Sequence, residues 1–137
     1  MAVITEIIRL NEEGSLSFGN YELKEKTKVL DFEVAGRLYK AKTFKEVTKL
    51  KRDGALVYES LPGTAVHAFV IDDEGVTFEV EGIEVTQITL ELEPQKEYKI
   101  IIDDVTVDNI QTTVSGKINF SVEATHEAKK VVVKKIG

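Results

Sequence analysis

Acidic side chains are the most frequent candidates in this sequence for catalysis or metal binding. Some of them occur in two short clusters. The clusters are Asp72, Asp73 and Glu74, and Asp103, Asp104 and Asp108. Carboxylate oxygens are ligands that Ca²⁺ prefers, so either cluster could hold a calcium ion. Neither follows the order of acids, glycine and closing glutamate of an EF-hand loop. Acids also favour exposed turns, and the sequence leaves both interpretations open.

Paired carboxylates are the requirement for glycoside hydrolysis, where a proton donor and a nucleophile flank a cleft. The candidates are Glu79, Glu81, Glu91 and Glu93. All four alternate with apolar residues, as the wet face of a β-strand does. No pair stands out, and the sequence predicts no catalytic residue.

Histidine and cysteine offer little metal or nucleophile chemistry. His67 lies in an apolar run, His126 lies in a polar turn, and neither has a second ligand at metal spacing. We expect both histidines at the surface, with no zinc site and no cofactor. The chain has no cysteine, which excludes disulfides and thiol nucleophiles. Its glycines are scattered singly, so no phosphate-binding loop or nucleophile elbow occurs.

Three tyrosines could form a platform on which sugar rings stack. They are Tyr21, Tyr39 and Tyr58. Tyrosines at such positions are also common as half-buried strand residues, and this alternative stays open.

The net charge is −6, and it is unevenly distributed. Residues 1–60 hold ten acids and eleven bases, whereas residues 61–128 hold fourteen acids and three bases. Phosphate binding needs clustered basic residues, so the acidic stretch argues against nucleic acid. The bases of the first part include Lys24, Lys26, Lys28, Lys40, Lys42 and Lys45. They alternate with apolar residues, and we interpret them as solvated strand faces. The acidic stretch and the lysine-rich C-terminus also suggest that copies attract one another head to tail.

The pattern from Thr86 to Ile102 predicts two half-buried strands joined by a corner. Apolar residues alternate with polar ones, stop at Pro94 and resume at Tyr98. The segment from Leu92 to Ile100 resembles the corner of fibronectin type III and immunoglobulin-like sandwiches. There, a tyrosine hydroxyl bonds back to the upstream backbone.

Polar clusters ending in glycine predict three hairpins, at residues 11–14, 51–54 and 72–75. Residues 29–44 look like two short strands around Gly36, and further strands follow at 118–122 and 131–136. Residues 44–52 are ambiguous, because Thr43 and Glu46 fit a capping box and a two-turn helix competes with a strand. The predicted fold class is all-β, built of antiparallel hairpins.

The length suits one domain of ordinary size. Leu61–Thr64, which contains Pro and Gly, is the best internal break. We expect an N-terminal hairpin region over 1–60 and an immunoglobulin-like sandwich over 61–137, packed as one compact unit. The N-terminus lacks a secretion signal, because Glu6 and Arg9 interrupt its apolar run. No stretch reaches the roughly 20 apolar residues of a membrane span. A cytoplasmic protein is expected, and a secreted mature form is the alternative.

Four segments carry a family resemblance: SLSFGNYEL, LYKAKTFKEVTKL, VYESLPGTAVHAF and ITLELEP. With them, the chain resembles a group of short proteins from clostridia and related Firmicutes that are catalogued as endosialidase. Taken literally, the name implies hydrolysis of polysialic acid. Sialidases, however, are much longer β-propellers with an arginine cluster and tryptophan-containing aspartate boxes. This chain has no tryptophan, and its arginines are Arg9, Arg37 and Arg52. The resemblance therefore implies origin and architecture, and no site residue is carried over.

These observations favour a non-catalytic β domain that acts in self-assembly or protein binding, with another copy or another protein as partner. A carbohydrate-binding module with a glycan ligand is the alternative. A glycan-degrading enzyme is the third hypothesis, and a pocket holding paired acids or an arginine cluster would favour it.

Overall fold

The computed structural model describes residues 2–136, which form thirteen β-strands and no helix. The first six strands are β1 (Ile8–Leu10), β2 (Leu16–Phe18), β3 (Thr27–Val34), β4 (Arg37–Phe44), β5 (Val47–Arg52) and β6 (Ala55–Leu61). The other seven are β7 (Ala65–Asp72), β8 (Gly75–Glu81), β9 (Val85–Glu91), β10 (Glu97–Ile102), β11 (Val105–Gln111), β12 (Lys117–Glu123) and β13 (Lys129–Lys135). Within this part of the chain, no helix is long and apolar enough to cross a membrane.

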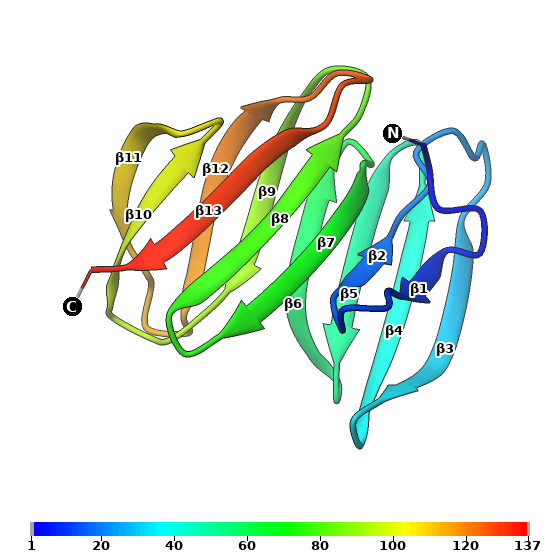
Figure 1. Ribbon diagram of the computed structural model, residues 1–137, viewed down its shortest axis with the longest axis horizontal. Helices are drawn as coiled ribbons and strands as arrows, with labels where there is room; N and C mark the ends of the chain where they lie inside the picture. Colours follow the sequence, from blue (N-terminus) through cyan, green and yellow to red (C-terminus); the bar gives the residue numbers. More distant parts are fainter. Residues whose placement is uncertain (1, 137) are drawn as a thin grey trace.

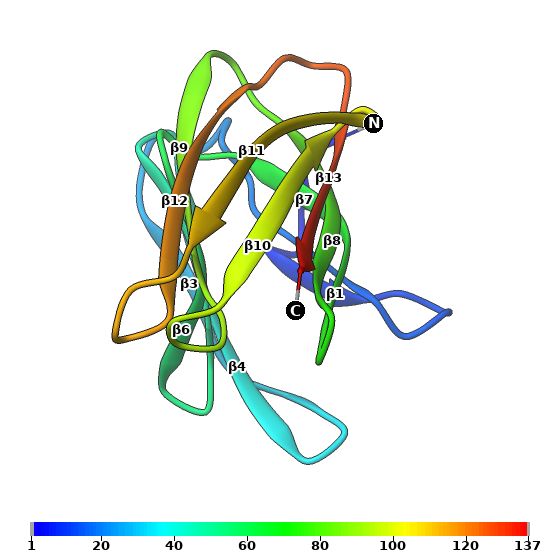
Figure 2. The ribbon, with the colours of Figure 1, turned by 90° about the vertical axis from the view of Figure 1, so that its left-hand side faces the viewer.

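The strands form two antiparallel sheets that pack face to face (Figures 1 and 2). Sheet A has the order β1-β2-β7-β8-β13-β10-β11, and sheet B has the order β12-β9-β6-β5-β4-β3. The prediction of an all-β fold of antiparallel hairpins with a sandwich is confirmed.

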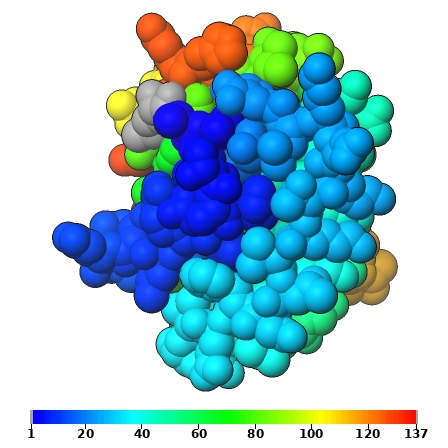
Figure 3. Space-filling view, turned by 90° about the vertical axis from the view of Figure 1, so that its right-hand side faces the viewer, coloured from blue at the N-terminus to red at the C-terminus, as the bar shows by residue number. Residues whose placement is uncertain are grey.

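The sandwich includes strands from both parts of the chain. In sheet A, β2 pairs with β7, and in sheet B, β6 pairs with β9. The break predicted at Leu61–Thr64 is the crossing from sheet B to sheet A. The N-terminal residues lie against the segments that follow them, and the turn between β1 and β2 projects from the body (Figure 3).

All three predicted hairpins are present, as the pairs β1–β2, β5–β6 and β7–β8. Their glycines have positive φ angles, as the polar-cluster-plus-glycine pattern requires. Gly75 shows a second requirement, since a Cβ atom there would overlap the Val133 carbonyl of the neighbouring strand.

The helix considered for residues 44–52 is wrong, because these residues form a strand hairpin. β4 and β5 are joined by the turn at Lys45 and Glu46, and Thr43 lies opposite Thr48 in the ladder. Both threonines are buried and their hydroxyls are 2.8 Å apart. Long-range pairing within sheet B has therefore overridden the local helical signal.

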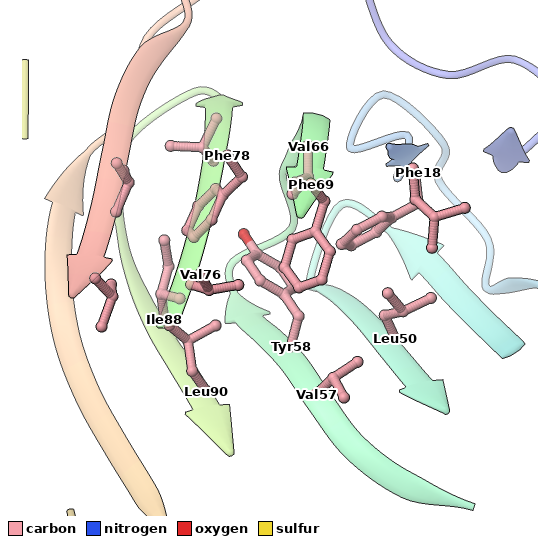
Figure 4. Close-up of a cluster of buried hydrophobic side chains, with 14 of the residues drawn as sticks. Phe18, Leu50, Val57, Tyr58, Val66, Phe69, Val76, Phe78, Ile88 and Leu90 are labelled. Atoms are coloured by element: carbon pink, nitrogen blue, oxygen red, sulfur yellow. The ribbon is translucent and has the colours of Figure 1, made fainter. Parts of the chain in front are cut away.

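Aromatic side chains fill the space between the two sheets (Figure 4). Phe18, Phe69 and Phe78 come from sheet A, and Tyr58 comes from sheet B. Tyr58 meets Phe18 and Phe78 edge-on, with ring centroids 5.3 and 5.6 Å apart. Each such pair contributes about 1 kcal/mol beyond the burial of its apolar area.

The predicted corner joins the two sheets. β9 belongs to sheet B and β10 to sheet A, and Pro94 lies in the link between them. The hydroxyl of Tyr98 accepts a hydrogen bond from the backbone N–H of Glu93, five residues upstream, at 3.3 Å. The predicted bond from the tyrosine back to the backbone is confirmed.

Candidate functional site

Five lysines lie together on the outer face of sheet B, and we call this surface the lysine face. Its members are Lys28 on β3, Lys40 and Lys42 on β4, and Lys49 and Lys51 on β5. Strand alternation places them outward, because their neighbours Ala41, Thr43, Thr48 and Leu50 are buried. This surface faces away from sheet A (Figure 2).

Like charges oppose one another directly across this surface. Lys42 lies opposite both Lys28 and Lys49, and Lys40 lies opposite Lys51. Like charges at such positions destabilise a sheet. Among the residues described, Lys49 is the one member with an ion pair, to Glu59 at 3.2 Å.

The crowding of charge changes the acid–base chemistry of Lys42. Partial burial, followed by repulsion from neighbouring lysines, lowers the pKa of its ammonium group below the usual lysine value. Lys49 contributes the largest repulsion and Lys26, Lys28 and Lys40 add to it. The surface therefore carries positive charge that the fold leaves largely unneutralised.

The sequence prediction treated these lysines as separate solvated positions, whereas the structure gathers three of the six that it named. Lys24 and Lys45 lie outside the strands. A signal was present in the sequence. Lys40 and Lys42 lie on one side of the turn at 45–46, and Lys49 and Lys51 lie at matching distances on the other. A tight hairpin with that register must bring the four together.

An apolar surface adjoins the lysine face on the same side of sheet B, and we call it the apolar patch. Of its members, Phe44, Val47, Leu61 and Val85 face outward, because their strand neighbours are buried, and Ile83 lines a hollow with Lys45 and Pro62 where these strands end. Leu61, Ile83 and Val85 are 50%, 62% and 52% exposed. Exposed apolar groups next to charged ones are the usual composition of a protein-binding surface.

A second polar cluster lies at the end of β8, on the face of sheet A opposite the core residues Val66 and Val80, and joins both histidines. His67 Nε2 lies 2.8 Å from Glu81 Oε1, and the hydroxyl of Tyr21 lies 3.3 Å from Glu81 Oε2. The same hydroxyl lies 3.2 Å from His126 Nδ1. Glu81 is only 1% exposed. Three distant segments of the chain therefore meet at one buried carboxylate.

The hydrogen-bond roles follow from the carboxylate, which can only accept when ionised. His67 Nε2–H and the Tyr21 O–H then donate to Glu81, and the tyrosine oxygen accepts from His126 Nδ1–H. Burial, followed by the charge of Glu81, raises the pKa of Tyr21 to about 12. This cluster holds the β2–β3 loop, which contains Tyr21, and the β12–β13 loop, which contains His126, against sheet A.

The expectation that both histidines are surface residues is half wrong. The side chain of His67 is 12% exposed, whereas His126 is exposed as predicted. Glu81 was interpreted as part of a wet strand face, yet it is buried at the end of β8. No local pattern marks these residues, because their partners are 14, 60 and 105 residues apart in the chain.

A cleft opens at the end of the sandwich and contains two of the three arginines, Arg37 and Arg52, among several acids. Arg37 Nε is 2.5 Å from Asp53, which also accepts the backbone N–H of Leu38 at 2.9 Å. Those two bonds lower the pKa of Asp53. Glu93, also in the cleft wall, pairs with Lys135 at 2.5 Å. Several of the charged groups thus tie hairpins and strands together.

The acidic clusters considered for calcium bond to the backbone. Asp72 accepts the N–H of Glu74, Asp103 accepts that of Lys130, and Asp108 accepts that of Asn109. Over residues 2–136, no three metal-ligating side chains come together. The Asp72 bond is the turn-forming role of aspartate, whereas the Asp103 bond ties the β10–β11 turn to β13.

The three tyrosines considered for sugar stacking are buried. Tyr21, Tyr39 and Tyr58 are 2%, 9% and 0% exposed. The hydroxyl of Tyr58 bonds to Thr64 Oγ1 inside the sandwich at 2.8 Å. The predicted platform is wrong, because these rings are part of the core.

Comparison with known proteins adds no relative: no family model, no curated protein and no solved structure matches the chain. The resemblance to the short endosialidase group therefore stays an expectation.

Proposed function

We propose that this protein is a non-catalytic binding domain that docks an acidic protein surface onto the outer face of sheet B. The observation that carries the proposal is the lysine face beside the apolar patch. A partner with carboxylates and apolar side chains would neutralise the first and cover the second.

The energetics of the lysine face support a binding role. Opposed lysines cost the folded protein stability, and carboxylates of a partner would remove that cost on binding. Positive charge also attracts an acidic partner from a distance and speeds association. The five lysines lack the forked guanidinium groups and stacking rings that nucleic acids favour, which supports a protein partner.

The non-catalytic part of the proposal is supported by the end cleft. In that cleft Arg37 is paired with Asp53, and Glu93 is paired with Lys135, so these four charges have structural partners already. A catalytic pair needs groups that are held apart and directed toward a substrate. The buried tyrosines likewise remove the main support for the carbohydrate-binding alternative.

The test uses a labelled peptide of alternating glutamate and leucine, and fluorescence anisotropy measures its binding. The lysine-face variant combines Lys40→Glu, Lys42→Glu and Lys51→Glu. The matched control combines Lys96→Glu, Lys130→Glu and Lys134→Glu, which makes the same change in charge away from the lysine face. We expect the lysine-face variant to bind at least about tenfold more weakly than the control, because each lost charge-assisted bond is worth about 1.5–3 kcal/mol.

Two further measurements complete the test. A glutamate–serine peptide should bind more weakly than the glutamate–leucine peptide, because it leaves the apolar patch exposed. Native mass spectrometry at low salt asks whether the partner is a second copy, in which case the lysine-face variant alone loses its oligomers. Equal peptide binding by the variant and its control would overturn the proposal.

A further inference from the structure

A small hollow lies in the middle of the lysine face and is lined by Lys40, Lys42, Lys49 and Lys51. The four residues come from two adjacent strands, two from each, in directly opposed pairs. Paired residues across strands are roughly 5 Å apart, and alternate residues along a strand are roughly 7 Å apart. Four lysine side chains therefore line one small space, and the ammonium group of Lys49 is paired with Glu59.

The balance of charge around the hollow is positive. Of the four lysines, Lys49 has Glu59 as a partner, and Lys28 adds a further positive charge opposite Lys42. Burial, followed by repulsion from the neighbouring lysines, lowers the pKa of Lys42. A monovalent anion would offset part of this charge, whereas a divalent oxyanion would offset about two charges at once.

Lysine suits such a ligand, because its ammonium group is a compact charge with three donors on a flexible stem. A tetrahedral oxyanion presents acceptors in several directions, so more than one lysine can donate to it at the same time. Carboxylates can also pair with these lysines, but each carries a single charge, whereas one divalent oxyanion brings two charges into the same small space.

We propose that the hollow between Lys40, Lys42, Lys49 and Lys51 binds a single divalent tetrahedral oxyanion of the phosphate or sulfate type. This inference deepens the proposed function, on which it rests, because the anion is then the group by which the partner is held. The source is either the free ion or a phosphorylated side chain of the partner protein, since both present the same chemistry.

The first test titrates the full-length protein with sodium sulfate, inorganic phosphate, acetate and chloride at matched ionic strength, with NMR detection of the lysine side chains. Sulfate and phosphate should cause saturable shifts centred on the four lining lysines. Lys42→Gln should weaken sulfate binding about tenfold or more, because a charge-assisted bond is lost. Lys130→Gln on sheet A is the control and should leave the affinity unchanged. Equal, non-saturating shifts with all four salts would overturn the inference.

A second variant should change sulfate affinity in the opposite direction. Glu59→Gln removes the carboxylate that pairs with Lys49, so sulfate should bind severalfold more tightly. Weaker binding by this variant would contradict the charge argument. A phosphoserine peptide that binds more tightly than free phosphate identifies a phosphorylated partner, and equal affinity identifies the free ion.

The two proposals fail in different ways. If sulfate and phosphate do not bind but the glutamate–leucine peptide does, the proposed oxyanion site is wrong and the proposed docking surface is still supported. If the ions bind but the peptide does not, the acidic protein partner is wrong and the oxyanion site stands.

Discussion

The interior polar cluster and the lysine face treat charge in opposite ways. At the end of β8, the buried Glu81 bonds to His67 and Tyr21, and no buried side-chain nitrogen or oxygen over residues 2–136 lacks a partner. On the lysine face, Lys42 instead lies between two other lysines. The fold balances its interior charge and leaves its surface charge unbalanced.

The two regions therefore have different roles: the buried cluster contributes to stability, and the lysine face is available for binding. A polar group that is buried without a partner destabilises the fold, so the interior cluster must be complete in the free protein. An exposed charge is solvated by water, so opposed lysines cost little and can persist. Substitutions in the two regions should therefore differ in the size and sign of their effect on stability.

The largest expected effect is that of Glu81→Ala, which leaves His67 and Tyr21 without their shared acceptor. Breaking a buried pair in this way costs about 3–5 kcal/mol. Urea denaturation measures the loss. Glu79→Ala, on the same face of the same strand but only half-buried, is the control and should change the free energy of unfolding by about 0.5 kcal/mol or less. Similar losses in both variants would show that Glu81 has no special role.

A smaller loss is expected for Thr48→Val inside the sandwich. The Thr48 hydroxyl bonds to the backbone N–H and C=O of Thr64, and the substitution leaves both groups buried without it. We expect a loss of about 1–3 kcal/mol in the free energy of unfolding. Thr89→Val on the outer face of β9 removes a threonine hydroxyl that bonds at the surface and should be nearly neutral. An unchanged free energy of unfolding for Thr48→Val would contradict the claim that buried polar groups of this fold need their hydrogen-bond partners.

The interior cluster also predicts how stability depends on alkaline pH. The pKa values of Tyr21 and Tyr58 are raised to about 12, mainly by burial, so the folded state favours their neutral forms. Their contribution to stability is complete below the unfolded tyrosine pKa of about 10 and is lost as pH rises toward 12. Ultraviolet titration of tyrosinate should show two groups that ionise near pH 12 in the folded protein. Ionisation of Tyr21 and Tyr58 near pH 10 in the folded protein would contradict the stabilisation of their neutral forms by burial.

The smallest effect is expected on the lysine face, and its sign is reversed. Lys42→Gln relieves repulsion from Lys28 and Lys49 and should stabilise the protein by a few tenths of a kcal/mol at low salt. The gain should shrink in 1 M salt because screening weakens surface repulsion. Lys117→Gln is the control and should not stabilise, because Lys117 lies opposite Glu91. Destabilisation by Lys42→Gln at low salt would remove the contrast between the two regions.

Local patterns in the sequence were sufficient to predict most of the strands and their turns. Alternation located β9, β10 and β12, and polar clusters ending in glycine located the hairpins, because both signals depend on neighbouring residues. The segment at 44–52 could not be decided locally, since the burial of Thr48 and Leu50 depends on strands β4 and β6.

The candidate sites were harder to predict because they depend on tertiary contacts. Lys40, Lys42, Lys49 and Lys51 become one surface only when the hairpin register is known. Tyr21, Glu81 and His126 come from segments whose proximity no period reveals. Glu81 looked solvated because it shares the strand face of Thr77 and Glu79, whereas Tyr21 and His67, from other segments, lie against it.

The most direct test of unbalanced charge is an NMR titration of the Lys42 side chain, with and without the glutamate–leucine peptide. In the free protein, the pKa of Lys42 should lie below that of an ordinary lysine, because the ammonium group is partly buried among like charges. Saturation with the peptide should raise it toward or above about 10.4, because carboxylates favour the charged form. An ordinary pKa in the free protein, or a lowered pKa that the peptide leaves unchanged, would contradict the account.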